Sequence, residues 1–122
     1  MPDSAVNVAG TPTTEEMLKR IEDLGPFIEE CADNSEQEGH LTARLVDALH
    51  EAQLFRMLLP KPYNGLEVTP PTFMQSIEAV ARHDASTAWC LCQQNGCSMS
   101  AAIARPDVAS LIWGDDPRGA LA

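Results

Sequence analysis

The sequence predicts an all-α domain, an up-and-down bundle of four to five helices. Three observations indicate it. Apolar residues recur at spacings of three and four along several segments, capping residues precede these segments, and the uncharged segment over residues 85–104 has the composition of a buried central helix. With 122 residues, 44% of them hydrophobic, the chain is long enough to form one domain with its own core.

The first predicted helix follows a tail over residues 1–12 that is rich in Pro, Gly, Ser and Thr and is expected to be flexible. The helical domain is expected to span residues 13–118. Thr13 and Glu16 form a capping box at its start. One apolar stripe follows the box: Met17, Ile21, Leu24, Ile28 and Cys31. Gly25-Pro26 interrupts this stripe and predicts a kink or a break.

Two further amphipathic helices and a loop lie between this helix and the uncharged segment. Thr42 caps a helix whose inward-facing residues are Leu45, Val46, Leu49 and Ala52. The apolar run over residues 54–59 then meets two prolines and Tyr63-Asn64-Gly65, which predicts an ordered loop. Thr69, followed by two prolines, begins the next helix. A last short helix is expected to begin at Arg105-Pro106-Asp107.

The uncharged segment contains three consecutive amides, Gln93, Gln94 and Asn95. In a dry core each amide would need hydrogen-bond partners, so something polar should face them. Two interpretations remain open. Asn95-Gly96 breaks the segment into two helices joined by a polar turn, or the stretch lines a cavity for a ligand, with Gly96 and Cys97 leaving room.

The charge of the chain excludes two classes of partner. The net charge is −10, and residues 1–38 account for −8 of it. Nucleic acids and anionic membranes bind clusters of Lys and Arg, so neither is expected as a partner. The amino-terminal residues lack the features of a signal peptide, and no run of 18 apolar residues is present. These features predict a cytoplasmic protein with reduced cysteines.

No metal site and no catalytic residue is predicted. If Cys90, Cys92 and Cys97 lie on one helix, the first two point about 200° apart, and Cys90 and Cys97 are separated by about 10 Å along the axis. Such thiols cannot share one ion, so we expect small buried thiols. None of the three histidines has a nucleophile nearby, and no nucleotide-binding, P-loop, hydrolase or zinc-protease motif occurs. These histidines are His40, His50 and His83.

Three stretches in fixed order carry a family resemblance. They are LHEAQLFRMLLPKPY at residues 49–63 with the turn NGLE at 64–67, FMQSIEAVARHDASTA at 73–88, and Trp89 with the final Ile112-Trp113-Gly114. Over about residues 14–118 the chain resembles the amino-terminal helical domain of the acyl-CoA dehydrogenase superfamily of flavoproteins. The likeness is greatest to the branch that contains the two-component flavin-dependent monooxygenases, which share the Ser-x-x-Trp pattern of residues 86–89.

The resemblance implies that this chain forms one wall of a substrate pocket. The implied pocket residues are Tyr63, Trp89, Cys92, Gln93, Gly96 and Cys97. Family members continue through a flavin-binding β-domain and a carboxy-terminal helical domain, which these 122 residues do not contain. Those regions are expected to bind most of the cofactor (FAD, with FMN as the alternative), to supply the catalytic base and to build a homotetramer. The chain alone is therefore expected to be inactive.

Three functions follow from these considerations. The first expectation is α,β-desaturation of an acyl thioester by a flavin oxidoreductase. The alternative is oxygenation of an aromatic compound by reduced flavin from a separate flavin reductase. A third is a stand-alone helical interaction module without catalysis.

Two departures from the family pattern bear on these functions. Many relatives have Tyr-Gly-Gly where this chain has Tyr63-Asn64-Gly65. Because Asn tolerates positive φ, we expect the turn to survive. Relatives that hydroxylate aromatic substrates often have His where this chain has Cys97, which weakens the oxygenation alternative.

Overall fold

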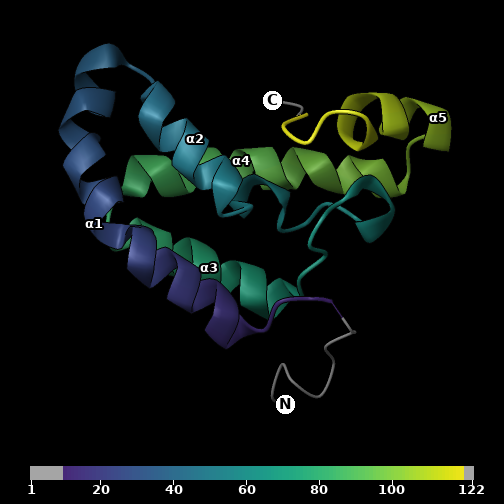
Figure 1. Cartoon of the computed structure of the whole chain (residues 1–122), viewed down its shortest axis with the longest axis horizontal. Coiled ribbons are helices and arrows are strands. Elements are labelled where there is room, and N and C mark those ends of the chain that lie inside the picture. Colours follow the sequence, from purple (N-terminus) through teal and green to yellow (C-terminus); the bar gives the residue numbers. More distant parts are fainter. Residues whose placement is uncertain (1–9, 120–122) are drawn as a thin grey trace.

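The computed structural model describes residues 10–119, so residues 1–9 of the expected tail lie outside the described residues. Within the described range the chain forms helices and turns and no strand, which confirms the all-α class. Figure 1 shows the arrangement of the five α-helices. They are α1 (Thr14–Glu38), α2 (Ala43–Glu51), α3 (Pro70–Ala81), α4 (Ala85–Ser98) and α5 (Pro106–Ala109). Short helical turns are η2 (Leu54–Arg56), η3 (Lys61–Tyr63), η4 (Met99–Ala102) and η5 (Ser110–Gly114).

The long helix α1 begins at the predicted capping box. The Thr13 hydroxyl accepts a hydrogen bond from the Glu16 backbone N–H (3.1 Å), and the Glu16 carboxylate accepts one from the Thr13 N–H (3.2 Å). Pro26 lies inside the helix without breaking it, and Figure 1 shows that α1 changes direction partway along. The kink therefore forms and the break does not. One reason is that apolar residues on both sides of Pro26 join the same core.

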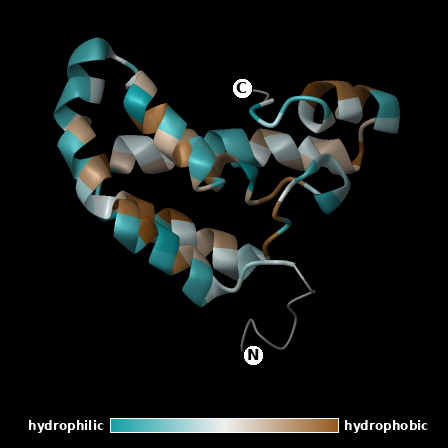
Figure 2. Cartoon of the chain, viewed as in Figure 1, coloured by the Kyte–Doolittle hydropathy of each residue, from teal (hydrophilic) through white to brown (hydrophobic). Residues whose placement is uncertain are grey.

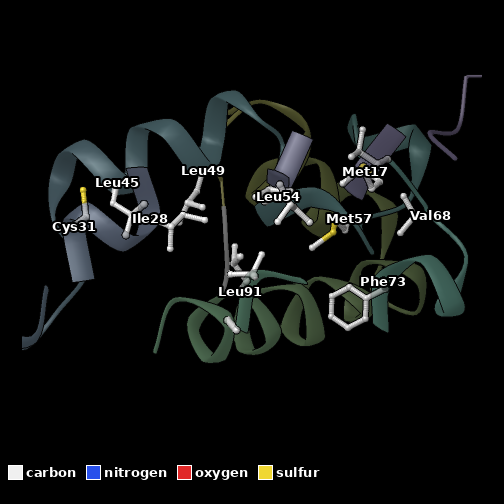
Figure 3. Close-up of a cluster of buried hydrophobic side chains, with 14 residues drawn as sticks. Met17, Ile28, Cys31, Leu45, Leu49, Leu54, Met57, Val68, Phe73 and Leu91 are labelled. Atoms are coloured by element: carbon white, nitrogen blue, oxygen red, sulfur yellow. The ribbon is translucent and has the colours of Figure 1, made fainter. Parts of the chain in front are cut away.

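The main core lies among the helices α1 to α4 and the loop over residues 54–68. The helix α1 packs along α3, and α3 packs along α4. Figure 2 shows hydrophobic and hydrophilic residues alternating along α1, as expected for a helix with one face in the core. Figure 3 shows the buried side chains of this core. Its larger members are Met17, Ile21, Ile28, Leu45, Leu49, Leu54, Met57, Phe73, Val80 and Leu91.

A second, smaller core holds the carboxy-terminal segment. It consists of Leu59, Ala101, Ala109 and Trp113, and Tyr63 and Ile112 pack against it. Trp113 is 2% exposed. The segment from α5 through η5 is therefore attached to the loop over residues 54–68 and to the end of η4.

Backbone hydrogen bonds order the loop over residues 54–68. The N–H groups of Leu66 and Val68 donate to the carbonyls of Arg56 and Met57, each at 2.9 Å. Asn64 adopts the left-handed conformation with φ of 68°, as the sequence predicts for this position of the family turn. The predicted ordered loop is confirmed.

Candidate functional site

The helix α4 is fixed at its start by Asp84. The Asp84 carboxylate accepts hydrogen bonds from the Thr87 N–H (3.0 Å) and the Thr87 hydroxyl (2.6 Å), and so caps the first turn. One face of the helix is then buried against α3 and the loop over residues 54–68. The residues of this buried face are Thr87, Ala88, Leu91, Asn95 and Ser98.

Asn95 is the amide that lies in the core. Its side chain is fully buried. The Nδ2 group donates to the carbonyls of Leu54 and Leu91, both at 2.8 Å, and Oδ1 accepts from the Leu58 N–H at 3.1 Å. The helix continues through Asn95 and Gly96 to Ser98, so the interpretation as two helices joined by a polar turn is wrong. Asn95 bonds to the loop without disturbing the helix.

The opposite face of α4 is uncovered. Trp89 is 65% exposed and Met99 is 56% exposed, and between them Cys92, Gln93 and Gly96 are also exposed. The expectation of a buried central helix is therefore wrong for this face, although it holds for the face that contains Leu91. A low charge content indicates that a surface avoids water, and monomeric proteins rarely expose large apolar patches. The face has the character of an interior surface or a binding surface.

Four of the six predicted pocket residues lie together on this uncovered face: Trp89, Cys92, Gln93 and Gly96. Cys97 is half-buried on the neighbouring side of the helix, which it shares with Cys90 and Gln94. Tyr63 is half-buried and packs against the second core instead. The prediction that the cysteines of this helix are buried thiols is wrong for Cys92. This residue lies on the uncovered face of α4 and is exposed.

Sequence analysis missed the role of Arg56. This side chain is 6% exposed. Its guanidinium donates to four backbone carbonyls, those of Tyr63 (2.9 Å), Trp113 (3.0 Å), Asp116 and Gly119. Burial lowers the pKa of Arg56, and the negative charge of Asp116 opposes that shift. A single charged residue within the apolar run LFRMLL is the signal that could have indicated a buried arginine with backbone partners.

Each histidine contacts another group of the chain. The Nδ1 atom of His83 lies 2.9 Å from Glu29 Oε2, and Nδ1 of His40 lies 2.9 Å from the Leu41 carbonyl. The ring of His50 contacts the ring of Phe55 in a tilted arrangement, with ring centroids 4.6 Å apart. Burial lowers the pKa of His50, and the positive charges of Arg118 and Arg56 lower it further.

The described residues contain neither a candidate metal cluster nor a helix suited to span a membrane. Among residues 10–119, no three His, Cys, Asp or Glu side chains come close enough to share a metal ion. None of the described helices combines the length and apolar character that crossing a bilayer requires.

Comparison with protein families gives a match over most of the chain. The family described as "Acyl-CoA dehydrogenase, N-terminal domain" matches residues 13–106. These residues include α1 through α4 and the loop over residues 54–68.

Two curated relatives are oxygenating enzymes. The p-hydroxyphenylacetate 3-hydroxylase oxygenase component of Acinetobacter baumannii is 32% identical over 101 residues, which are 83% of this chain and 24% of that protein. Indole-3-acetate monooxygenase of Pseudomonas putida is 31% identical over 91 residues, or 72% of this chain and 21% of that protein. The chain thus spans under a quarter of the length of these relatives.

Solved structures give the same likeness. XiaF from Streptomyces sp., solved in complex with FADH2 and glycerol, superposes with a TM-score of 0.81 at 25% identity, covering 85% of this chain and 26% of XiaF. The HsaA monooxygenase from M. tuberculosis superposes with a TM-score of 0.78 at 26% identity, covering 85% of this chain and 27% of HsaA.

Proposed function

The chain belongs to the acyl-CoA dehydrogenase amino-terminal domain family, and we propose that it forms the amino-terminal domain of the oxygenase component of a two-component flavin-dependent monooxygenase. The observation that carries this proposal is its likeness to named monooxygenases and hydroxylases over more than 70% of the chain. The expected α,β-desaturation of an acyl thioester finds no support in these relatives.

The uncovered face of α4 fits part of a flavin enzyme's cavity. This face carries no charged side chain between Trp89 and Met99, and a Cβ added at Gly96 would meet no atom within 4 Å. It therefore suits an uncharged, planar group such as an aromatic substrate or a flavin ring. A flavin's phosphates need donors or positive charges, which this face does not offer. We propose that other parts of the polypeptide bind the phosphates.

The residues of this face have separate tasks in the proposed cavity. When bound, reduced flavin supplies the two electrons that oxygenation consumes. Trp89 and Cys92 form an apolar wall that excludes water from the substrate. The Gln93 amide can orient a polar group of an aromatic substrate through a hydrogen bond. Gly96 leaves room for the ring, and Cys97 lies beside it.

The overall reaction defines the partners. One oxygen atom of O2 enters the aromatic substrate, the other leaves as water, and reduced flavin becomes oxidised flavin. The oxygenase must therefore receive reduced flavin, FADH2 or FMNH2, from a separate flavin reductase. The family resemblance also supports a homotetramer, which light scattering of the full polypeptide can measure.

The test uses the full polypeptide that contains this chain. It is supplied with reduced flavin, 18O2 and, in turn, p-hydroxyphenylacetate and indole-3-acetate, the compounds named for two relatives. Labelled oxygen in a hydroxylated product supports the proposal. Bleaching of bound flavin by an acyl-CoA thioester without oxygen would instead establish desaturation, and a polypeptide that binds no flavin would support the helical interaction module.

A matched pair of variants tests the role of the α4 face. Gln93→Leu should reduce product formation at least about tenfold, because the exposed amide is proposed to orient the substrate, while the unfolding midpoint hardly changes. Gln75→Leu makes the same change at an exposed position of α3 and should leave both quantities unchanged. Equal losses of activity and stability in Gln93→Leu would indicate a structural amide.

A further inference from the structure

A groove lies between the end of α1, the start of α2 and the side of α4 that contains Cys90 and Gln94. Two adjoining hollows of about 470 and 300 Å³ form it, and His40, Leu41 and Cys90 line both. The larger hollow extends along α1 to Ser35 and Glu36 and along α4 to Trp89. Most of the residues that line the larger hollow belong to the second half of α1 and the beginning of α4, two segments that can be followed in Figure 1.

Two polar atoms in the walls of this groove have no hydrogen-bond partner. Ser35, which lines the larger hollow, is 6% exposed, and its hydroxyl oxygen is buried and unpaired. Gln94 lines the smaller hollow, and its Oε1 atom is likewise buried and unpaired. More than nine in ten buried polar groups have a partner. Rotation of either side chain into its hollow would present an oxygen that accepts a hydrogen bond from a ligand.

The charged residues around the groove determine whether a cation or an anion is favoured there. Glu36 and Asp84 line the larger hollow, and no Lys or Arg is among the residues that line either hollow. The helix α1 ends here without a basic residue in its last turn, so the negative end of its dipole adds to the field of the two carboxylates. The positive charges of Arg118 and Arg56 act on His50, in the wall of the smaller hollow. A cation is favoured in the larger hollow.

The apolar residues of the groove indicate what the uncharged part of the ligand, its body, consists of. Trp89 lies in the wall of the larger hollow and is 65% exposed, so its ring is available to an ammonium group or to an aromatic ring. The smaller hollow is lined by Leu41, Val46 and Phe55. These side chains suit a hydrophobic body about the size of a phenyl ring.

We propose that this groove binds an organic ammonium ion with an aromatic or alkyl body. The ammonium group lies near Glu36 and Asp84 and donates to the Ser35 hydroxyl, and the body extends past Cys90 toward Leu41. This inference does not rest on the proposed function. It concerns a different side of α4 from the uncovered face, and the two share only Trp89.

The test compares three ligands with the same phenyl ring and different charges. Phenethylammonium, 2-phenylethanol and phenylacetate are titrated separately into the 15N-labelled chain at constant ionic strength, and chemical shifts are followed by NMR. Phenethylammonium is expected to bind with a Kd in the millimolar range, because so small a ligand makes few contacts. Its shifts should fall on the amides of Ser35, Glu36, His40 and Cys90 and on the Trp89 indole N–H. Phenylacetate should bind about tenfold more weakly because its charge is reversed.

Variants separate a local site from the effect of net charge. Glu36→Gln should weaken phenethylammonium binding about two- to fivefold, the range for an exposed ion pair. Glu30→Gln removes the same charge at another exposed position of α1, one that does not line the groove, and should leave the affinity unchanged. Similar binding of all three ligands, no binding, shifts elsewhere in the chain, or equal losses in both variants would each overturn the proposal.

Discussion

Gly65 is required by its surroundings rather than by its own backbone angles. A Cβ at this position would overlap the carbonyl oxygen of Leu59, a backbone atom that cannot move aside. The Gly65 N–H also donates to the Pro60 carbonyl at 3.1 Å, so the close approach is part of the turn. Gly96 contrasts with it, because a side chain there would enter open space.

These two glycines give a paired prediction. Gly65→Ala should lower the free energy of unfolding by about 3 kcal/mol, because the turn must open to relieve the overlap. Gly96→Ala should raise it by about 0.5–1 kcal/mol, because alanine is the better helix former within α4. Urea unfolding of both variants and the parent checks the prediction. Equal destabilisation of the two variants would contradict it.

The two tryptophans differ in how far their side chains are exposed. If Trp89 belonged to the core, its truncation to alanine would cost about 3–5 kcal/mol. It is 65% exposed, whereas Trp113 is 2% exposed. We therefore expect Trp113→Ala to cost that amount and Trp89→Ala to cost less than about 1 kcal/mol in thermal unfolding of this chain. A large loss in Trp89→Ala would show that its ring packs in the core.

His50 makes stability depend on pH. Its pKa is lowered in the folded chain by burial and by the charges of Arg118 and Arg56, so below its ordinary value of about 6.5 the unfolded chain binds more protons. The stabilisation is complete above that value and is lost as the pH falls through the lowered pKa of the folded state. Urea unfolding should show a smaller loss between pH 6.5 and 5 in His50→Gln than in the parent. An equal loss in His50→Gln and the parent would contradict this role of His50.

At the scale of helices, the residue pattern predicted where helices start, how they are capped and which residues share a face. It predicted less well which of these faces the rest of the chain buries. The capping box at Thr13 and the kink near Pro26 could be predicted because both depend on local backbone chemistry. The exposure of the Trp89 face could not. Composition indicates that a face avoids water, but it does not indicate which surface covers it. Arg56 was missed for a related reason, since its four acceptors are backbone carbonyls that carry no residue signal.

The connection between α4 and the loop over residues 54–68 depends on Asn95. Asn95→Ala should lower the free energy of unfolding by about 2–4 kcal/mol, because the Leu54 carbonyl and the partly buried Leu58 N–H lose this partner and a small cavity opens. Gln93→Ala, two positions away and exposed, should change it by less than about 0.5 kcal/mol. Urea unfolding measures both. A small effect of Asn95→Ala would mean that water replaces the amide.

At the scale of the whole molecule, a buried charged side chain helps to join the two cores. The larger core unites α1 to α4, while the smaller one holds the segment from α5 to η5. Arg56 lies in the loop between them and bonds to carbonyls on both the loop and the carboxy-terminal segment. Its planar guanidinium provides several donors in fixed directions, which allows four acceptors to share one cation.

Arg56→Lys should therefore loosen the carboxy-terminal segment. An ammonium group cannot reach four carbonyls in the same geometry, so we expect a loss of about 2–4 kcal/mol in the free energy of unfolding. Hydrogen exchange should also become faster for amides of residues 106–119. Arg82→Lys makes the same change at an exposed ion pair with Glu78 and should cost less than about 0.5 kcal/mol. Unchanged exchange in Arg56→Lys would contradict the role of Arg56.

The acidic surface of α1 has a consequence for how copies of this chain behave toward one another. Residues 1–38 carry a net charge of −8, while α4 presents an uncovered apolar face. Like charges repel over about 10 Å at 0.1 M salt and over about 3 Å at 1 M. Dilute buffer therefore keeps two such faces apart, and concentrated salt removes that barrier while strengthening apolar contact. We therefore expect the isolated chain to stay dispersed at low salt and to self-associate at high salt.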